Sequence, residues 1–151
     1  MSASSTGSRV LADVNVWLAT LVQQHPHHQR AINWWRRKVL PDGQEVLFCR
    51  VTQLGLLRLL SNETVMGASR RTLREAWRDY DRLLAQGPIG YLHEPDDVDQ
   101  VLRSHTLDES ASASLWTDAY LAAFARAADV RLATFDRGFS RFSGLRLQLL
   151  D

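Results

Sequence analysis

The sequence predicts an α/β protein with three layers, in which a mostly parallel sheet lies between two layers of helices. Short apolar runs alternate along the chain with segments of helical periodicity, and parallel strands require such crossover helices. The chain has 151 residues, of which 45% are apolar. This length and composition suit one domain with a well-filled core.

Five short runs are predicted to be strands from their apolar character, with an extended segment as the alternative for 89–92. They span 10–12, 45–49, 89–92, 131–135 and 145–149. Helices are expected between them, at 15–22, 27–39, 53–60, 70–84, 95–104 and 115–128. The segment 41–43 is predicted to be a turn and the small, polar segment 108–114 a loop.

The helix over 70–84 has the clearest pattern. Its apolar residues recur at helical spacing and predict one buried stripe, formed by Leu73, Ala76, Trp77, Tyr80, Leu83 and Leu84. Ser69 is predicted to cap this helix and Thr52 to cap the preceding one, since both residue types are favoured at the N-cap. Gly87 and Pro88 are predicted to end it.

Two features bear on domain organisation and compartment. Residues 1–8 are small and polar without an apolar core, so we expect a mobile tail rather than a signal peptide, followed by one domain over 9–151. The single cysteine, Cys49, cannot form an internal disulfide, which favours a cytoplasmic location. No apolar run is long enough to suggest a membrane span.

The charge balance excludes a protein that coats nucleic acid by bulk charge. Lys and Arg number 18 and Asp and Glu 17, for a net charge of +1. A local basic groove remains compatible with this balance. Two basic clusters, at 36–38 and at Arg70, Arg71 and Arg74, are interpreted as solvated faces, with tracking of RNA phosphates as the alternative.

Three aspartates stand at positions typical of a functional site. Asp13 and Asp136 each directly follow a predicted strand, and functional crevices of parallel sheets lie beyond the carboxyl ends of the strands. Asp118 falls within the apolar stripe of its helix, where an unpaired carboxylate would be costly to bury. The alternative is that all three are ordinary turn or helix-terminus residues.

Three carboxylates at one edge would favour a hard divalent cation such as Mg²⁺, which prefers oxygen ligands. Such an ion polarises a phosphodiester and activates water. Zinc is less favoured because no Cys or His cluster accompanies the acids. The histidines at 25, 27 and 28 are interpreted as a polar helix start rather than a zinc site.

Three segments around these aspartates occur in order along the chain. They are 11–18 (LADVNVWL), 115–123 (LWTDAYLAA) and 132–139 (LATFDRGF). They resemble, respectively, the opening segment, the third-acid helix and the T-F-D-x-x-F segment of PIN-domain ribonucleases of the bacterial VapC toxin family. The resemblance extends from about residue 10 to 150.

This resemblance implies a PIN fold, RNA cleavage that depends on Mg²⁺ or Mn²⁺, a homodimer and a VapB-type antitoxin as partner. It implies that Asp13, Asp118 and Asp136 are the metal-site acids, with Asn15 beside the first and Thr134 beside the last. One departure is visible. PIN nucleases usually carry a further acid in the segment that corresponds to 51–55, where this chain has the uncharged Gln53. The amide oxygen of Gln53 could still accept a hydrogen bond from a metal-bound water, and Glu109 is a second candidate for the missing charge.

The resulting hypothesis is a toxin-type endoribonuclease whose acids hold one or two Mg²⁺ ions, leaving a 5′-phosphate and a 3′-hydroxyl. Two alternatives remain open. Because Gln53 replaces an acid, the chain could be a catalytically weak module that binds RNA or protein. A small metal phosphohydrolase would use the same arrangement of acids.

Overall fold

The computed structural model describes residues 8–151, so the tail predicted over 1–8 falls almost wholly outside the described residues. A sheet of five strands runs in the order β3-β2-β1-β4-β5, and every neighbouring pair is parallel. The strands are β1 (Arg9–Ala12), β2 (Glu45–Phe48), β3 (Ile89–Tyr91), β4 (Arg131–Thr134) and β5 (Leu147–Leu149). The prediction of a parallel sheet is therefore confirmed.

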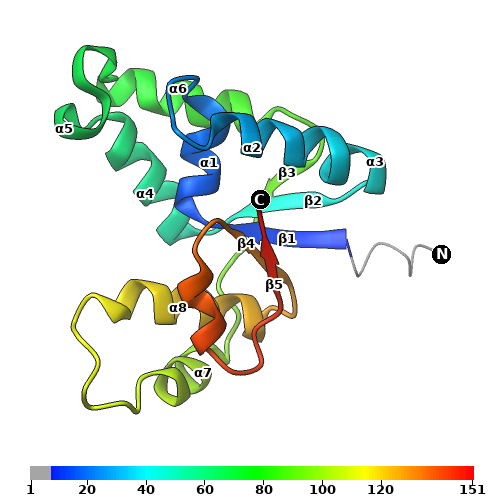
Figure 1. The fold of residues 1–151 in the computed structure, drawn as a ribbon, viewed down its shortest axis with the longest axis vertical. Coiled ribbons are helices and arrows are strands. Elements are labelled where there is room, and N and C mark those ends of the chain that lie inside the picture. Colours follow the sequence, from blue (N-terminus) through cyan, green and yellow to red (C-terminus); the bar gives the residue numbers. More distant parts are fainter. Residues whose placement is uncertain (1–7) are drawn as a thin grey trace.

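Helices cover both faces of the sheet, as predicted (Figure 1). One layer contains α1 (Val14–Leu21), α2 (His28–Trp34), α4 (Arg50–Leu60) and α6 (Leu73–Leu84), and the other contains α7 (Val98–His105) and α8 (Leu115–Ala127). Alternate strand residues point to opposite faces. Val10 and Ala12 accordingly pack under the first layer, while Leu11 packs under the second.

Trp17 anchors α1 beneath the sheet. Its ring is fully buried and stacks on Phe48 at 3.8 Å between centroids. Its indole N–H donates to the carbonyl of Ala12 at 3.1 Å, which satisfies the polar atom of the buried ring. Trp34 is also buried and Trp35 packs partly buried beside it, so both belong to the core. These contacts fix the start of α1 against the end of β1.

The segment predicted as one helix over 27–39 continues further than expected. The π-helical turn η2 (Trp35–Val39) joins α2 to the short α3 (Leu40–Asp42), and Leu40 N–H donates to the Trp35 carbonyl. Gly43, at φ 64°, ends the helical stretch in the left-handed region. The turn predicted over 41–43 therefore begins later, because proline is tolerated in the first turn of a helix.

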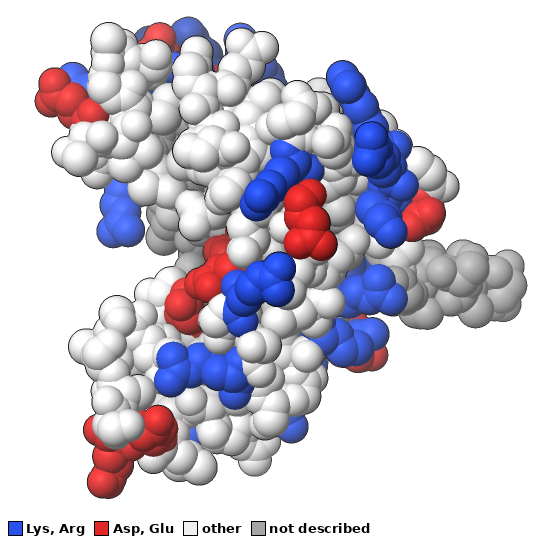
Figure 2. Space-filling view, in the orientation of Figure 1, with Lys and Arg blue, Asp and Glu red and all other residues white. Residues whose placement is uncertain are grey.

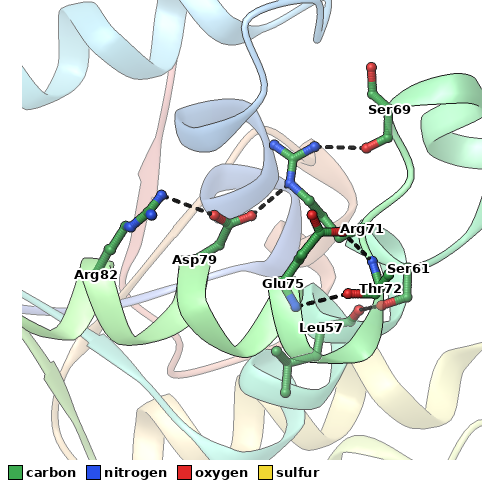
Figure 3. Close-up of polar contacts among 8 residues, drawn as sticks. All are labelled: Leu57, Ser61, Ser69, Arg71, Thr72, Glu75, Asp79 and Arg82. Atoms are coloured by element: carbon green, nitrogen blue, oxygen red, sulfur yellow. Dashed lines mark hydrogen bonds and ion pairs between the residues drawn. The ribbon is translucent and has the colours of Figure 1, made fainter.

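The structure corrects both predicted caps. Helix α4 begins at Arg50 with Cys49 as its N-cap, and the Thr52 hydroxyl accepts from the Cys49 N–H at 2.9 Å. Helix α6 follows α5 (Glu63–Met66) and η3 (Gly67–Ser69) and is capped by Thr72, not Ser69 (Figure 3). Glu75, three residues after Thr72, completes a capping box by accepting from the Thr72 N–H at 2.9 Å.

The buried stripe of α6 is narrower than predicted. Ala76, Tyr80 and Leu83 are buried, but Leu73 is 74% exposed and Trp77 is 46% exposed. Both exposed side chains line a surface pocket of about 440 Å³ between α4 and α6. The basic cluster at the start of α6 is partly paired, since Arg71 donates to Asp79 at 2.9 Å (Figure 3).

Gly55 sets the distance between α1 and α4. A Cβ at this position would lie 2.7 Å from Cγ2 of Val14 and 3.3 Å from its Cγ1. The two helices can approach this closely only because residue 55 has no side chain. Since Val14 directly follows Asp13, this contact also fixes which face of α4 lies over the first aspartate.

Replacement of Gly55 by Ala tests this contact. In a helix, alanine ordinarily stabilises the folded state by about 1 kcal/mol relative to glycine. Here the added Cβ would clash with Val14, so Gly55→Ala should instead lower the free energy of unfolding by about 1–3 kcal/mol. Urea denaturation would measure the effect. The control is the double variant Gly55→Ala, Val14→Ala, which should be more stable than Val14→Ala alone. A single variant as stable as wild type would show that α1 and α4 can move apart freely.

Candidate active site at the carboxyl edge of the sheet

Two of the predicted acids lie together because β1 and β4 are neighbours. Ala12 is in register with Ala133, and the Asp13 N–H donates to the Ala133 carbonyl at 2.9 Å. The chain leaves both strands at the same edge, so Asp13 and Asp136 project beyond it. This edge also contains the point where the strand order reverses, the usual place for a functional crevice in an open α/β sheet.

The Asp13 carboxylate is held by both of its oxygens. Oδ1 accepts from the Val14 N–H at 2.7 Å and thereby caps α1, while Oδ2 accepts from the Thr134 hydroxyl at 2.8 Å. The buried Trp17 below it keeps α1 in place. The direction of Asp13 is therefore fixed by contacts with both neighbouring elements.

Thr134 connects the first and last acids. Its side chain is fully buried, and its hydroxyl oxygen also accepts from the Asp136 N–H at 3.0 Å. Asp136 in turn caps η4 (Arg137–Arg141) by accepting from the Gly138 N–H at 2.8 Å. A single hydroxyl thus positions the Asp13 side chain and the Asp136 backbone.

The three acids also interact electrostatically. Burial raises the pKa of Asp13, the hydrogen bonds from Thr134 and Val14 oppose the rise, and the charges of Asp118 and Asp136 add to it. Burial and the charge of Asp136 raise the pKa of Asp118, which lies in the first turn of α8, while Arg141 opposes this rise. The structure therefore brings Asp13, Asp118 and Asp136 into one electrostatic site.

The donor set suits a hard cation, although it is not a closed cage. Carboxylate oxygens are the ligands that Mg²⁺ prefers, and a positive ion would relieve the repulsion among the three acids. Within residues 8–151, no three His, Cys, Asp or Glu side chains lie close enough to hold an ion among them. An ion that keeps several waters and binds directly to only one or two carboxylates fits this open arrangement.

A pocket of about 410 Å³ opens beside Asp13. Its lining combines the start of α1, one face of α4 and the start of α8: Asp13, Val14, Asn15, Val51, Leu54, Gly55, Arg58, Leu59 and Thr117. Figure 2 shows a hollow between the α4–α6 and α7–α8 sides of the molecule, with acidic side chains at its base and basic side chains on both sides. Sequence reasoning missed Arg58 and Thr117, although the helical spacing of 51, 55 and 58 could have identified Arg58.

Gln53 is not among the residues that line this pocket, and its role beside a metal-bound water stays a prediction. Its amide oxygen accepts from Arg50 at 2.6 Å, and it also hydrogen-bonds with Tyr80. Gly55 instead takes the position on α4 that faces Asp13. The face of α4 that lines the pocket therefore carries no carboxylate among the described residues.

The other candidate ligands lie outside the site. Glu109 is exposed in the loop before α8 and contributes to neither raised pKa. His27 stacks on Phe135 at 4.7 Å, and the His28 ring hydrogen-bonds with the Ala19 carbonyl at 2.6 Å. His27 and His28 thus pack against Phe135 and α1.

Comparison with known proteins identifies the family. A model of the PIN domain matches residues 10–145. Ribonuclease VapC41 of Mycobacterium tuberculosis is 39% identical over 150 residues, which cover 93% of this chain and 98% of the relative. The chain belongs to the VapC group of PIN-domain proteins. Ribonuclease VapC29 of the same organism is 30% identical, with 89% of this chain and 91% of the relative covered.

Solved structures agree on the fold. VapBC2 from Rickettsia felis, bound to a DNA fragment from its promoter, superposes with a TM-score of 0.67 at 12% identity and covers 95% of this chain and 99% of that chain. Mycobacterium tuberculosis VapC20, a toxin that cleaves the sarcin-ricin loop, gives a TM-score of 0.63 at 18% identity, with coverages of 91% and 98%. The PIN fold predicted from the sequence is confirmed.

The raised pKa of Asp13 predicts a pH-dependent effect of Asp13→Asn on stability. The pKa of Asp13 in the folded protein lies above the unfolded value of 3.8. At a pH above the folded pKa, the ionised side chain therefore destabilises the folded state. This destabilisation is lost as the pH falls through the folded pKa. Asparagine can cap α1 without carrying the charge. The variant should therefore melt a few degrees above wild type at pH 7 without divalent ions.

Thermal melts between pH 7.5 and 3.5 would measure this difference, which should shrink as the pH falls. The exposed Asp96 offers a matched control. The melting temperature of Asp96→Asn should stay close to that of wild type at every pH. Equal or lower stability of Asp13→Asn at pH 7 would contradict the electrostatic penalty.

Proposed function

We propose that this protein is an endoribonuclease that hydrolyses RNA phosphodiesters and acts as the toxin of a toxin–antitoxin pair. The observation that carries the proposal is the gathering of Asp13, Asp118 and Asp136 beside an open pocket at the carboxyl edge of the sheet. Its relatives of 39% and 30% identity carry the name ribonuclease, which supports the same reaction class here.

Asp13, Asp118 and Asp136 would hold Mg²⁺, with Mn²⁺ as the alternative, one or two of the acids directly and the rest through water that the ion keeps. The ion would polarise the phosphodiester and activate water. The protein supplies the orientation. Thr134 and the Val14 N–H hold Asp13 in one direction. The side chain of Asn15 is exposed at the pocket and makes no hydrogen bond among residues 8–151, so it can donate its amide N–H to a phosphate oxygen.

The acids also argue against a module that binds RNA without cutting it. Three interacting carboxylates repel the phosphates of RNA, so they weaken simple RNA binding unless a cation is present. A site used only for binding gains nothing from such a cluster. Catalysis does gain, because a cation held there stabilises the charge that develops on the phosphate.

We propose a VapB-type antitoxin as the protein partner. A pocket of about 490 Å³ adjoins the pocket beside Asp13, called the acid pocket below, and shares Asn15 and Leu59 with it. Its remaining lining is mostly apolar, including Leu18, Val22 and Met66. An antitoxin segment with apolar side chains could fill this pocket and reach the acids with an Arg or Lys. The structural likeness to VapBC2 supports this partner.

We also propose a homodimer in the cytoplasm. Leu54, Leu73 and Trp77 are exposed around the pocket between α4 and α6 and supply apolar surface for a second copy.

Among residues 8–151, no helix is both long enough and apolar enough to cross a membrane. The buried thiol of Cys49, whose pKa is raised by burial, needs no oxidising compartment.

Asp118→Asn should abolish RNA cleavage while preserving the fold. Loss of one of the acids that hold the cation should lower the cleavage rate by at least about 100-fold, the scale of a lost electrostatic stabiliser. Purified protein would be incubated with total bacterial RNA and Mg²⁺, and the new 5′ ends would be sequenced. A chromogenic phosphoester run in parallel would identify a general phosphohydrolase. Full activity of Asp118→Asn would refute the proposed site.

Gln53→Glu tests whether residue 53 faces the acids, as the family resemblance implies, or lies against Arg50 and Tyr80, as in the structure. Because Gln53 contacts Arg50 and Tyr80 rather than the acids, an added carboxylate there should leave the Mg²⁺ dependence of cleavage within about twofold of wild type. The measurement is the initial cleavage rate against Mg²⁺ concentration. A clearly lower Mg²⁺ requirement would show that residue 53 does face the site.

A further inference from the structure

The pocket beside Asp13 contains one basic residue. Arg58 lies one helical turn beyond Gly55 on α4, and it carries the only positive charge among the residues that line this pocket within the described chain. It also lines the neighbouring pocket between α4 and α6. Arg58 therefore stands where the acid pocket continues outward along α4.

Its guanidinium is free. Within residues 8–151, the side chain of Arg58 makes no hydrogen bond and no ion pair, whereas Arg71 is bound to Asp79 and Arg103 to Asp99. Its five N–H donors are therefore available to a ligand.

The position of Arg58 is nevertheless determined. The contact between Gly55 and Val14 fixes the rotation of α4 against α1, and Leu56 and Leu60 bury the opposite face of the helix in the core. Residue 58 must then project over the pocket that contains Asp13. These contacts set the position of the backbone, while the long side chain can adjust to what it binds.

The chemistry of the ligand follows from this juxtaposition. An RNA strand that brings one phosphate to the three acids must also place its adjacent phosphates near the pocket wall, where no bound cation shields them. A guanidinium binds a phosphate through two parallel N–H···O bonds, with a geometry that an ammonium group cannot reproduce. Arg58 is the group in this pocket that can do so.

We propose that Arg58 binds an RNA phosphate adjacent to the scissile one and so positions the strand over Asp13. This inference rests on the proposed function. It makes Arg58 a positioning residue, whose loss should affect the binding of RNA more than the rate of the chemical step. It also assigns a direction to the substrate, from the acids outward along the face of α4 that lines the pocket beside Asp13.

The test measures RNA binding in the Asp13→Asn background, which keeps the probe intact. The probe is a fluorescein-labelled, single-stranded 12-nucleotide RNA of randomised sequence, followed by anisotropy from 50 to 300 mM KCl. Arg58→Gln should weaken binding about 5- to 10-fold at low salt. It should also reduce the slope of log Kd against log salt concentration by about 0.7, the value for one phosphate contact on a single strand.

Two further variants sharpen the result. Arg58→Lys should keep most of the salt slope but lose part of the affinity. Lysine keeps the positive charge but lacks the two parallel N–H donors of the guanidinium. Arg78→Gln is the matched control, since this exposed arginine of α6 lines neither the acid pocket nor the pocket between α4 and α6. It should bind RNA as the background protein does. A thermal melt of each variant confirms folding.

Cleavage assays distinguish a failure of the role assigned to Arg58 from a failure of the proposed function. In the otherwise wild-type protein, Arg58→Gln should raise KM with a smaller change in kcat. If the wild-type protein cleaves RNA but Arg58→Gln changes neither the affinity nor the salt slope, the inference is overturned and the proposed function stands. If the wild-type protein cleaves no RNA, the proposed function fails first, and the anisotropy titration still decides whether Arg58 binds a phosphate.

Discussion

The site depends on one hydrogen-bonded connection, the Thr134 hydroxyl between Asp13 and Asp136. Thr134 is the last residue of β4, and β4 pairs in parallel with β1, which Asp13 directly follows. The hydroxyl donates to one aspartate side chain and accepts from the backbone of the other. Sheet pairing thus brings the two acids to the same edge, and a single buried oxygen fixes their relative positions.

The acids are held in place against their mutual repulsion. Burial and neighbouring charges raise the pKa values of Asp13 and Asp118, so the ionised site weakens the folded state near neutral pH. The stability comes from elsewhere, especially from Trp17 on Phe48 and the two apolar cores on either side of the sheet. A ligand that neutralises the acids should therefore stabilise the whole domain.

Helix α4 gives this VapC-type site its particular charge distribution. Its close packing on α1 through Gly55 turns Val51, Gly55 and Arg58 toward the acids, and it turns Gln53 toward Arg50 and Tyr80. The wall contributed by α4 is therefore apolar and positive rather than acidic. The carboxylates come from α8 and from the ends of β1 and β4, and the free guanidinium comes from α4.

The sequence by itself determined the alternation of strands and helices and the edge at which Asp13 and Asp136 lie. This was possible because a parallel sheet sends every strand end to the same side, whatever the details of packing. For Asp118, the apolar helical stripe predicted burial and not proximity to the other two acids. The family resemblance pointed to the same three residues, and the family itself is shown by the comparisons.

Only the tertiary structure decided which residues of the helices face the site. Each residue rotates the side-chain direction by about 100° around a helix, so Gln53 and Gly55, two positions apart, point in nearly opposite directions. The exposure of Leu73 and Trp77 and the choice of Thr72 over Ser69 as cap depended in the same way on where each helix settles. A strand end has one possible edge, whereas the rotation of a helix is set by its neighbours, here by the absence of a side chain at Gly55.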